Sequence, residues 1–254
     1  MIEKTIFAHR GANRLAPENT MAAFRAAFEH GAKWIETDVD IDKDGTPIIC
    51  HDTTLDRTTD HTGRFYDLTD EEVAKVDAGS WFSKDFKGEH LPTLHELVDF
   101  LNETGMNANI ELKANEEGKE RSELLVKKVA EELARVEKSQ IIVSSFSFLL
   151  LYKIKQIAPE TVIGALWETC ALYDDWRSVL EMLGAEYVHP EDAGLTKERI
   201  QEFRDFGVGV NVWTVNDPAR INQLFHWGAT GVFTDISHQL TDRDRKSTRL
   251  NSSH

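Results

Sequence analysis

Short apolar runs alternate along the chain with longer amphipathic stretches. The apolar runs cover residues 5–8, 34–39, 107–112, 141–144, 162–166, 186–188, 209–213 and 231–234. The amphipathic stretches cover residues 20–30, 93–104, 119–136, 147–156, 174–182, 196–206 and 217–227. Strands that alternate with helices form parallel sheets, and eight such strands in a chain of this length are typical of a closed barrel. The pattern therefore predicts an α/β fold of the (β/α)8 TIM barrel type.

Capping residues support the boundaries of the predicted helices. Thr93 precedes Leu94 and is followed three residues later by Glu96, a spacing typical of a capping box. Asp217 is followed by Pro218, and proline is favoured in the first helical turn. An open doubly wound sheet is the alternative arrangement. No G-x-G-x-x-G sequence follows an apolar run, which weighs against that alternative.

One polar, turn-rich stretch, at about residues 52–91, interrupts the alternation after the second strand. Long connections in compact domains are often functional. We therefore interpret this stretch as a small insertion at the mouth of the barrel. The barrel and its insertion together are predicted to occupy residues 1–243.

Residues 244–254 differ from the rest of the chain because they have no apolar periodicity. They resemble the translation of a sequencing-adapter oligonucleotide, and we interpret them as a non-native tail. A natural polar tail is the alternative. The segment carries three basic side chains and one acidic side chain, so the net charge of −15 becomes −17 without it.

Composition and charge limit the classes of partner. A net charge of −15 is unfavourable for binding nucleic acid or an anionic membrane surface. No apolar run approaches the roughly 18–20 residues that span a bilayer, and no signal peptide is recognised at the start of the sequence. Cys50 and Cys170 fit a reducing compartment better than a disulfide framework. We expect a cytoplasmic protein that acts on a small molecule, and self-association into a homo-oligomer is left open.

Acidic side chains occur where the barrel pattern calls for apolar ones. Glu36 and Asp38 are two residues apart on a predicted strand and therefore both face the barrel interior, and Glu111 lies on a neighbouring strand. Adjacent carboxylates are costly unless a cation binds them, and their hard oxygen ligands suit Mg²⁺ or Ca²⁺. A solvated strand end is the alternative for the first two. Asp40 and Asp42 continue the same parity and are interpreted as turn residues.

Further candidates for chemistry lie at predicted strand ends. His9 and His51 suit an acid–base pair. Arg10 offers paired donors for a phosphate, with a surface ion pair as the alternative. Lys113 could neutralise a phosphate beside the metal or form an ion pair with the third carboxylate. Trp213 is expected either to line the pocket or to pack in the core.

Taken in order, these motifs resemble the glycerophosphodiester phosphodiesterase family from His9 to about Asp235. The motifs are His9-Arg-Gly11, Pro17-Glu-Asn-Thr20, Ile35-Glu-Thr-Asp-Val39, His51-Asp-x-x-Leu-Asp-Arg-Thr-Thr59, Leu91-Pro-Thr-Leu94, Glu111-Leu-Lys113, Ser145-Phe146 and Trp213-Thr-Val-Asn216. The resemblance implies a barrel, a divalent metal, and hydrolysis of a glycerophosphodiester to sn-glycerol 3-phosphate and an alcohol. It also implies three sets of residues: metal ligands Glu36, Asp38 and Glu111, the acid–base pair His9 and His51, and phosphate contacts Arg10 and Lys113.

The resulting hypothesis is a two-step reaction through a cyclic phosphate. One histidine removes the proton of the glycerol 2-hydroxyl, the other protonates the leaving alcohol, and water then opens the five-membered ring. The preferred assignment is His9 as base and His51 as acid. The alternatives are a lysophospholipase D-like phosphodiesterase and a non-catalytic phosphate-binding protein. The presence of both histidines and all three carboxylates weighs against the second alternative.

Overall fold

The computed structural model describes residues 4–240, so the predicted tail at 244–254 lies outside the described residues. Within residues 4–240, eight parallel strands form a ring that closes through the pairing of the first two. The barrel strands are β1 (Thr5–Ala8), β2 (Trp34–Ile41), β4 (Asn107–Leu112), β5 (Ile141–Ser145), β6 (Val162–Trp167), β7 (Tyr187–Pro190), β8 (Gly209–Val212) and β9 (Gly231–Thr234). The predicted TIM barrel is therefore confirmed.

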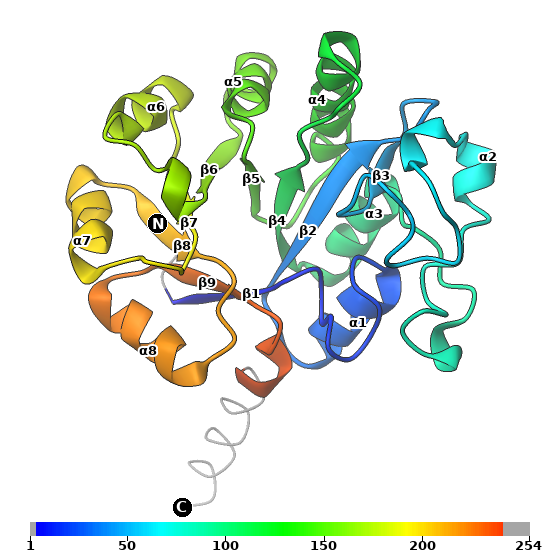
Figure 1. Ribbon diagram of the computed structural model, residues 1–254, viewed down its shortest axis with the longest axis horizontal. Helices are drawn as coiled ribbons and strands as arrows, with labels where there is room; N and C mark the ends of the chain where they lie inside the picture. The colour runs from blue at the N-terminus through cyan, green and yellow to red at the C-terminus, as the bar shows by residue number, and fades with distance from the viewer. Residues whose placement is uncertain (1–3, 241–254) are drawn as a thin grey trace, which may run out of the picture.

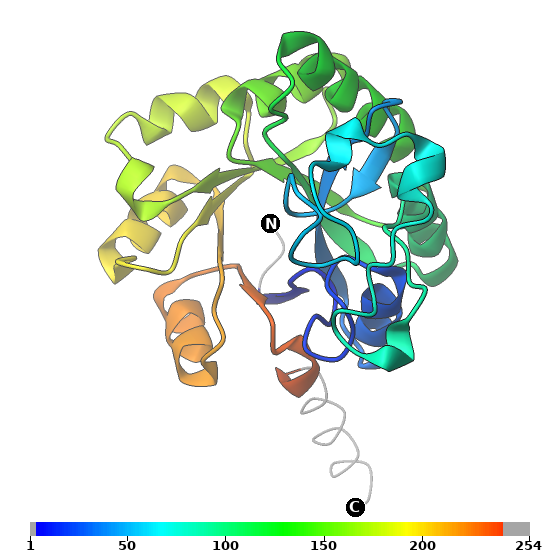
Figure 2. The same ribbon diagram turned by 45° about the vertical axis from the view of Figure 1, so that its right-hand side comes forward.

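Helices surround this ring on the outside (Figure 2). They are α1 (Met21–Glu29), α3 (Leu94–Thr104), α4 (Lys119–Leu133), α5 (Phe148–Ile157), α6 (Trp176–Leu183), α7 (Lys197–Phe206) and α8 (Pro218–Trp227). The predicted caps are present, because Thr93 and Glu96 form a complete capping box and the Asp217 side chain accepts the N–H of Ala219. No helix within residues 4–240 is both long enough and apolar enough to cross a bilayer.

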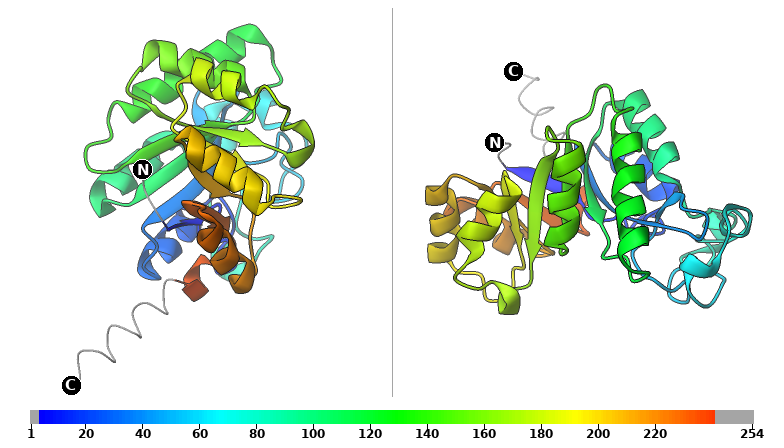
Figure 3. Two further views of the ribbon diagram at one scale, coloured as in Figure 1. Left: turned by 90° about the vertical axis from the view of Figure 1, so that its left-hand side faces the viewer. Right: turned by 90° about the horizontal axis from the view of Figure 1, so that it is seen from above.

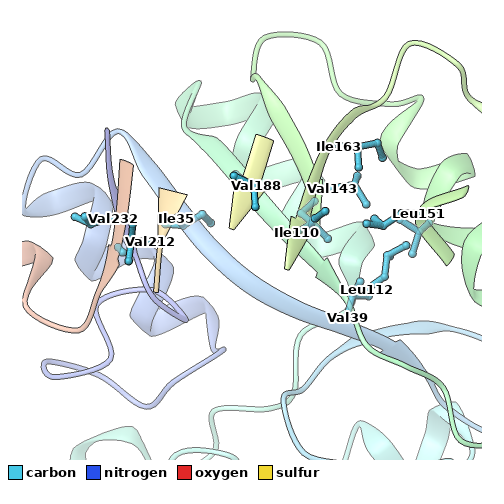
Figure 4. Packing of buried hydrophobic residues seen from close by; sticks show 14 of the residues in the cluster. Ile35, Val39, Ile110, Leu112, Val143, Leu151, Ile163, Val188, Val212 and Val232 are labelled. Carbon is cyan, nitrogen blue, oxygen red and sulfur yellow. The ribbon is translucent and has the colours of Figure 1, made fainter. Parts of the chain in front are cut away.

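Alternation along the strands separates two kinds of packing. Ile35 and Val39 of β2 face outward and are buried with residues of other strands, such as Ile110 and Val143, and with the surrounding helices (Figure 4). The side chains between them have the opposite parity and point into the barrel. Inside the barrel, these inward-pointing side chains include an aromatic-rich cluster. That cluster consists of Phe7, Trp34, Ile142, Tyr187 and Phe233.

Residues 42–93, between β2 and α3, project on one side of the barrel (Figure 1). They contain β3 (Pro47–Ile49), η1 (Phe65–Asp67), α2 (Asp70–Val73) and η2 (Lys84–Phe86). Strand β3 pairs antiparallel with β2, and the segment has its own buried cluster, which includes Leu55, Phe65 and Leu91. It lies at the opposite end of the molecule from α7 and α8 (Figure 3). This segment is therefore seated by its own small core and by β2.

The prediction that Asp40 belongs to a turn is wrong. Strand β2 extends to Ile41, and the Asp40 side chain is buried. Its carboxylate accepts hydrogen bonds from the Tyr66 hydroxyl and from Nδ2 of Asn115, at 2.7 Å for the latter. These partners satisfy a buried acid without a turn. Asp42 does occupy a turn, where its Oδ1 accepts the N–H of Gly45 at 3.0 Å.

Candidate active site

Strand register brings the three predicted metal ligands together. Asp38 of β2 is the direct neighbour of Glu111 on β4, and Glu36 lies two residues earlier on the same face. One carboxylate oxygen from each of the three lies within 4.8 Å of the others. All three side chains are largely buried. The cluster therefore offers convergent hard oxygen donors of the kind that Mg²⁺ and Ca²⁺ prefer.

The charges in this cluster are only partly neutralised by neighbouring residues. Burial and the adjacent charge of Asp38 raise the pKa of Glu36 to about 8, and the same two causes raise the pKa of Glu111. The pKa of Asp38 is lowered despite burial, because Lys113 and Arg10 lie beside it. Excess negative charge on three buried carboxylates is what a divalent cation would compensate. The donor set therefore fits such an ion.

Lys113 extends from the end of β4 toward the carboxylates. Its Nζ lies 2.9 Å from Oε1 of Glu111 and 3.3 Å from Oδ1 of Asp38. Both neighbours raise its pKa against the effect of burial, so the ammonium remains charged. The ion pair considered as the alternative role for this lysine is therefore present in the structure.

The loop after β1 directs Arg10 into the same region. Gly11 has a φ of +79°, and a Cβ there would lie 2.8 Å from the backbone of Ala23, so only glycine lets the loop approach α1 this closely. The backbone N–H of Arg10 donates to Oε2 of Glu36 at 2.9 Å. Its guanidinium donates from Nη1 to Glu18 at 2.8 Å. The buried Nε has no hydrogen-bond partner among the described residues and lies 3.5 Å from Oδ2 of Asp38.

His9 is held by a carboxylate that directly follows the last strand of the barrel. Its Nδ1 lies 2.7 Å from Oδ1 of Asp235, and its Nε2 lies 3.9 Å from Oε2 of Glu36. Burial opposes the charged ring, but the hydrogen bond to Asp235 and the charge of Glu36 outweigh it, so the pKa of His9 is raised. The carboxylate is itself fixed by the side-chain amides of Asn13 and Asn216, each at 2.7 Å.

His51 has an equivalent partner next to it in the sequence. Its Nδ1 lies 2.5 Å from Oδ1 of Asp52. Burial lowers the pKa of this histidine, and the nearby cations Lys113 and Arg10 act in the same direction, against the charge of Asp38. Each histidine is therefore oriented by a carboxylate at Nδ1, but the pKa of His9 is raised and the pKa of His51 is lowered.

These side chains gather at a cavity of about 140 Å³ at the carboxyl ends of the strands. It is lined by His9, Arg10, Glu36, His51, Asn109, Glu111, Ser144, Phe146, Leu166, Trp213, Thr214 and Phe233. Asp38 and Lys113 contact this lining through their ion pairs. The rings of Trp213 and Phe146 meet edge to face at 5.4 Å and form an apolar wall of this cavity. The structure thus brings all eight predicted site residues together.

A larger cavity, of about 660 Å³, lies elsewhere in the molecule. It is bordered by the first residues of several strands, including Trp34, Ile141 and Tyr187, and therefore opens at the amino-terminal ends of the barrel. None of the predicted site residues lines it. Because TIM-barrel enzymes have their active sites at the carboxyl ends of the strands, the smaller cavity is the candidate active site.

The residues that orient this site are not among those predicted from the sequence. Asp52 directly follows His51, and Asp235 directly follows the last strand. The sequence therefore carried a different signal at each position: an acid beside a candidate histidine at Asp52, and an acid at a strand end at Asp235. Glu18 and Asn19 belong to the Pro17-Glu-Asn-Thr20 motif. Asn19 in fact donates from Nδ2 to Oδ2 of Asp38 at 2.9 Å. These four residues contact the predicted site residues and hold them in place.

His189 does not belong to the cavity lining. It lies inside β7, fully buried, where Nδ2 of Asn211 approaches its Nε2 at 3.1 Å. A Cβ on Gly164 would lie 2.3 Å from the ring, so the imidazole fills space that this glycine leaves open. Burial lowers its pKa to about 3, which keeps the ring neutral. Its place is in the packed interior of the barrel.

A TIM barrel with buried carboxylates, paired cations and two carboxylate-held histidines at one mouth has the features of a hydrolytic enzyme. The sequence profile of the glycerophosphoryl diester phosphodiesterase family matches residues 9–238, and the chain belongs to that family. The family and the enzyme class predicted from the sequence are thereby confirmed.

Individual relatives agree with this assignment. The chain is 35% identical over 246 residues to a glycerophosphodiester phosphodiesterase of Caldanaerobacter subterraneus subsp. tengcongensis, which covers 95% of this chain and 98% of that protein. It is 33% identical to a glycerophosphodiester phosphodiesterase of Bacillus subtilis, over 92% of this chain and 85% of that protein. An Oleispira antarctica phosphodiesterase, solved in complex with the product sn-glycerol-3-phosphate, superposes with a TM-score of 0.89 at 30% identity, covering 94% of this chain and 96% of that one.

Proposed function

We propose that this chain hydrolyses glycerophosphodiesters to sn-glycerol 3-phosphate and an alcohol. The observation that carries the proposal is that two histidines, each held through Nδ1 by a carboxylate, line one cavity together with Arg10. The unpartnered, buried Nε of Arg10 offers a donor for a phosphate oxygen. The similar Oleispira antarctica phosphodiesterase has sn-glycerol-3-phosphate as its product, which supports the same reaction here.

Glu36, Asp38 and Glu111 are proposed to hold one divalent cation, Mg²⁺ or Ca²⁺. When bound, such an ion would stabilise negative charge on the phosphate and lower the pKa of a glycerol hydroxyl. Lys113 and Arg10, which already lie beside these carboxylates, would contact the remaining phosphate oxygens. The Phe146–Trp213 wall would pack against the carbon atoms of glycerol.

The two pKa shifts favour the reverse of the assignment preferred from sequence. His51, whose pKa is lowered, is suited to accept the proton of the glycerol 2-hydroxyl. His9, whose pKa is raised, is suited to donate a proton to the leaving alcohol. With each Nδ1 engaged by a carboxylate, Nε2 is the nitrogen available for transfer. We therefore propose His51 as base and His9 as acid in the first step.

In that step the 2-hydroxyl oxygen would form a bond to phosphorus while the bond from phosphorus to the alcohol oxygen breaks. The alcohol would leave with the proton from His9, and a five-membered cyclic phosphate would remain. Water would then open the ring with the histidine roles reversed, giving sn-glycerol 3-phosphate. Both histidines return to their starting protonation states, so the cycle is balanced.

A product assay tests the proposal directly. The protein is incubated with glycerophosphoethanolamine, glycerophosphocholine and glycerophosphoglycerol, with and without a chelator, and sn-glycerol 3-phosphate and the free alcohol are quantified. Metal-dependent release of both products in equal amounts is the expected result. Binding without turnover of any substrate would instead indicate the non-catalytic phosphate-binding protein considered as an alternative.

A specific observation favours a lysophospholipase D-like activity as a second candidate. A groove of about 490 Å³ continues from the cavity past Phe146 and Leu166, which line both. Its remaining lining residues are Phe148, Trp167, Glu168, Ala171, Tyr173, Asp175 and Val179. The groove lies between the β5–α5 and β6–α6 loops, and an acyl chain on the glycerol could lie along it. The apolar surface that this activity needs is thus outside the insertion.

Substitution in the groove separates the two candidates. Val179→Lys should lower kcat/KM for lysophosphatidylcholine while leaving that for glycerophosphocholine unchanged, because only the former reaches beyond Phe146. Equal effects on both substrates, or no effect on either, would remove the second candidate. The first candidate would stand in each case.

The cellular location and the partners of the protein are also proposed. Cys50 is buried, Cys170 is exposed, and both are free thiols. An exposed free thiol is compatible with a reducing compartment, which supports a cytoplasmic location. The partner is proposed to be the small-molecule substrate, with self-association left to a measurement of molecular mass in solution.

A further inference from the structure

Arg57 connects two carboxylates at the rim of the candidate active site. Its Nε and Nη2 donate to the two oxygens of Asp52, at 2.6 and 3.2 Å. Its Nη1 and Nη2 donate to the two oxygens of Glu18, at 2.9 and 2.7 Å. The guanidinium therefore makes two bidentate pairs at once, a geometry that lysine cannot reproduce.

Each carboxylate in turn holds a residue that lines the cavity. Asp52 uses Oδ1, the oxygen that also receives the 3.2 Å bond from Arg57, to hold Nδ1 of His51 at 2.5 Å. Glu18 uses Oε1 to accept from Nη1 of Arg10 at 2.8 Å. One continuous chain of hydrogen bonds thus runs across the mouth from a candidate catalytic histidine to a candidate phosphate ligand.

The two ends of this chain of hydrogen bonds belong to different parts of the fold. Arg10 and Glu18 lie between β1 and α1, whereas His51, Asp52 and Arg57 lie in the segment between β2 and α3. Without the guanidinium, Asp52 and Glu18 would present like charges to each other across this boundary. Arg57 therefore replaces repulsion between the two carboxylates with an ion pair to each, and this links the two segments.

The fold has other means of holding this segment in place. Leu55 and Phe65 belong to its own buried cluster, and Tyr66 donates to the buried carboxylate of Asp40 on β2. Arg57 itself is 46% exposed in its side chain, and exposed ion pairs usually contribute little to stability. Loss of the guanidinium should therefore disturb the cavity residues more than the fold.

We propose that Arg57 is a positioning residue that sets His51 and Arg10 in register through Asp52 and Glu18. The role in turnover rests on the proposed function, whereas the positioning itself does not. Arg57 acts through these two carboxylates and does not contact the substrate.

Activity measurements on three variants test the role in turnover. Arg57→Ala should lower kcat/KM by about 10- to 100-fold, the scale expected when reacting groups shift by about 1 Å. Arg57→Lys should recover only a small part, and added guanidinium should partly restore the alanine variant. Arg135→Ala is the matched control, because Arg135 also bridges two carboxylates, Glu132 and Asp99, on helices α3 and α4 away from the cavity lining. Its kcat/KM should equal that of the wild type.

Two measurements that do not depend on turnover test the positioning. In histidine-labelled protein, the Nδ1–H resonance of His51 should shift in Arg57→Ala and stay unchanged in Arg135→Ala. Titration with sn-glycerol 3-phosphate should give weaker binding only in the Arg57 variant, because Glu18, the partner of Arg10, is then no longer fixed by the Arg57 guanidinium. If the wild type lacks phosphodiesterase activity, the proposed function fails while these two measurements still decide the inference.

Several results would overturn the inference. An unchanged His51 resonance together with unchanged product binding in Arg57→Ala would show that neither end depends on the guanidinium. Full activity of Arg57→Lys would show that a single positive charge suffices. A fall in melting temperature of Arg57→Ala well beyond that of Arg135→Ala, with activity lost in proportion to the unfolded fraction, would assign Arg57 to the fold alone.

Discussion

His9 and Asp235 are 226 positions apart in the sequence, yet Nδ1 of the histidine lies 2.7 Å from Oδ1 of the aspartate. The register of the closing strands explains this contact. Ala8 of β1 pairs with Thr234 of β9, and His9 and Asp235 directly follow these two residues. Closure of the barrel therefore places Asp235 beside His9. A site that depends on this contact exists only in the completed fold.

Asp235→Asn should reduce kcat by at least about 10-fold, because the carboxylate both orients His9 and stabilises its charged form. Loss of the carboxylate lowers the pKa of His9. If His9 is the proton donor, activity is lost as pH rises through this pKa, so the alkaline limb should move to lower pH in the variant. A pH profile of kcat/KM for both proteins measures the shift. An alkaline limb that stays in place would mean that His9 is not the acid.

Removal of either imidazole should be more damaging. His9→Ala and His51→Ala should each lower kcat by about 10²–10⁴-fold, the usual contribution of general acid–base catalysis. Both residues follow strands and lie at the cavity, outside the packed clusters, so their melting temperatures should stay close to that of the wild type. Steady-state kinetics and thermal unfolding check both expectations. Wild-type turnover in either variant would exclude that histidine from the reaction.

Chelation should abolish turnover, and Glu36→Gln or Asp38→Asn should weaken binding of Mg²⁺ or Ca²⁺, because each removes one carboxylate ligand from the cluster. Asp40→Asn is a matched control: this acid is also buried and on the same face of β2, but Tyr66 and Asn115 occupy its oxygens. Calorimetric titration of chelator-treated protein compares the affinities. Equal losses in the control and the two ligand variants would contradict the assignment.

Much of this site could be predicted from the chain because strand parity is a local property. Glu36 and Asp38 stand out where a barrel needs apolar side chains, and His9 stands at a strand end. Strand parity does not reveal which residue forms a hydrogen bond with a given side chain. Asp40 has the same parity and looks like a turn residue until Tyr66, which lies beyond β3, supplies a hydrogen bond to it.

Residues that orient others are harder to predict for the same physical reason. Arg57 and Glu18 lie in loops without periodicity, and their bidentate pair depends on how the segment after β3 sits against the loop after β1. That placement is decided by packing between distant segments. The sequence therefore predicts the chemical groups of the site better than the contacts that hold them.

The buried His189 should make stability depend on pH. Its pKa is lowered to about 3 in the fold, below the ordinary value of 6.5, so the unfolded chain binds a proton that the folded chain does not. Its contribution is thus complete above about pH 6.5 and is lost as pH falls toward 3, by at most about 1.4 kcal/mol per pH unit. His189→Gln should remove this dependence. Urea unfolding of both proteins between about pH 5 and pH 7.5 gives the difference, and parallel curves would contradict the expectation.

A substrate without the 2-hydroxyl group tests the proposed cyclic intermediate. A 2-deoxy analogue of glycerophosphoethanolamine keeps its phosphate and should still bind near Arg10 and Lys113. Its turnover should fall by orders of magnitude, because intramolecular attack by a well-placed hydroxyl is worth about 7–11 kcal/mol. The measurement is ethanolamine release from both substrates at saturating metal, with binding of each followed separately. Similar turnover would favour direct attack by water and would require His51 to face that water, since the described cavity lining holds no further histidine to activate it.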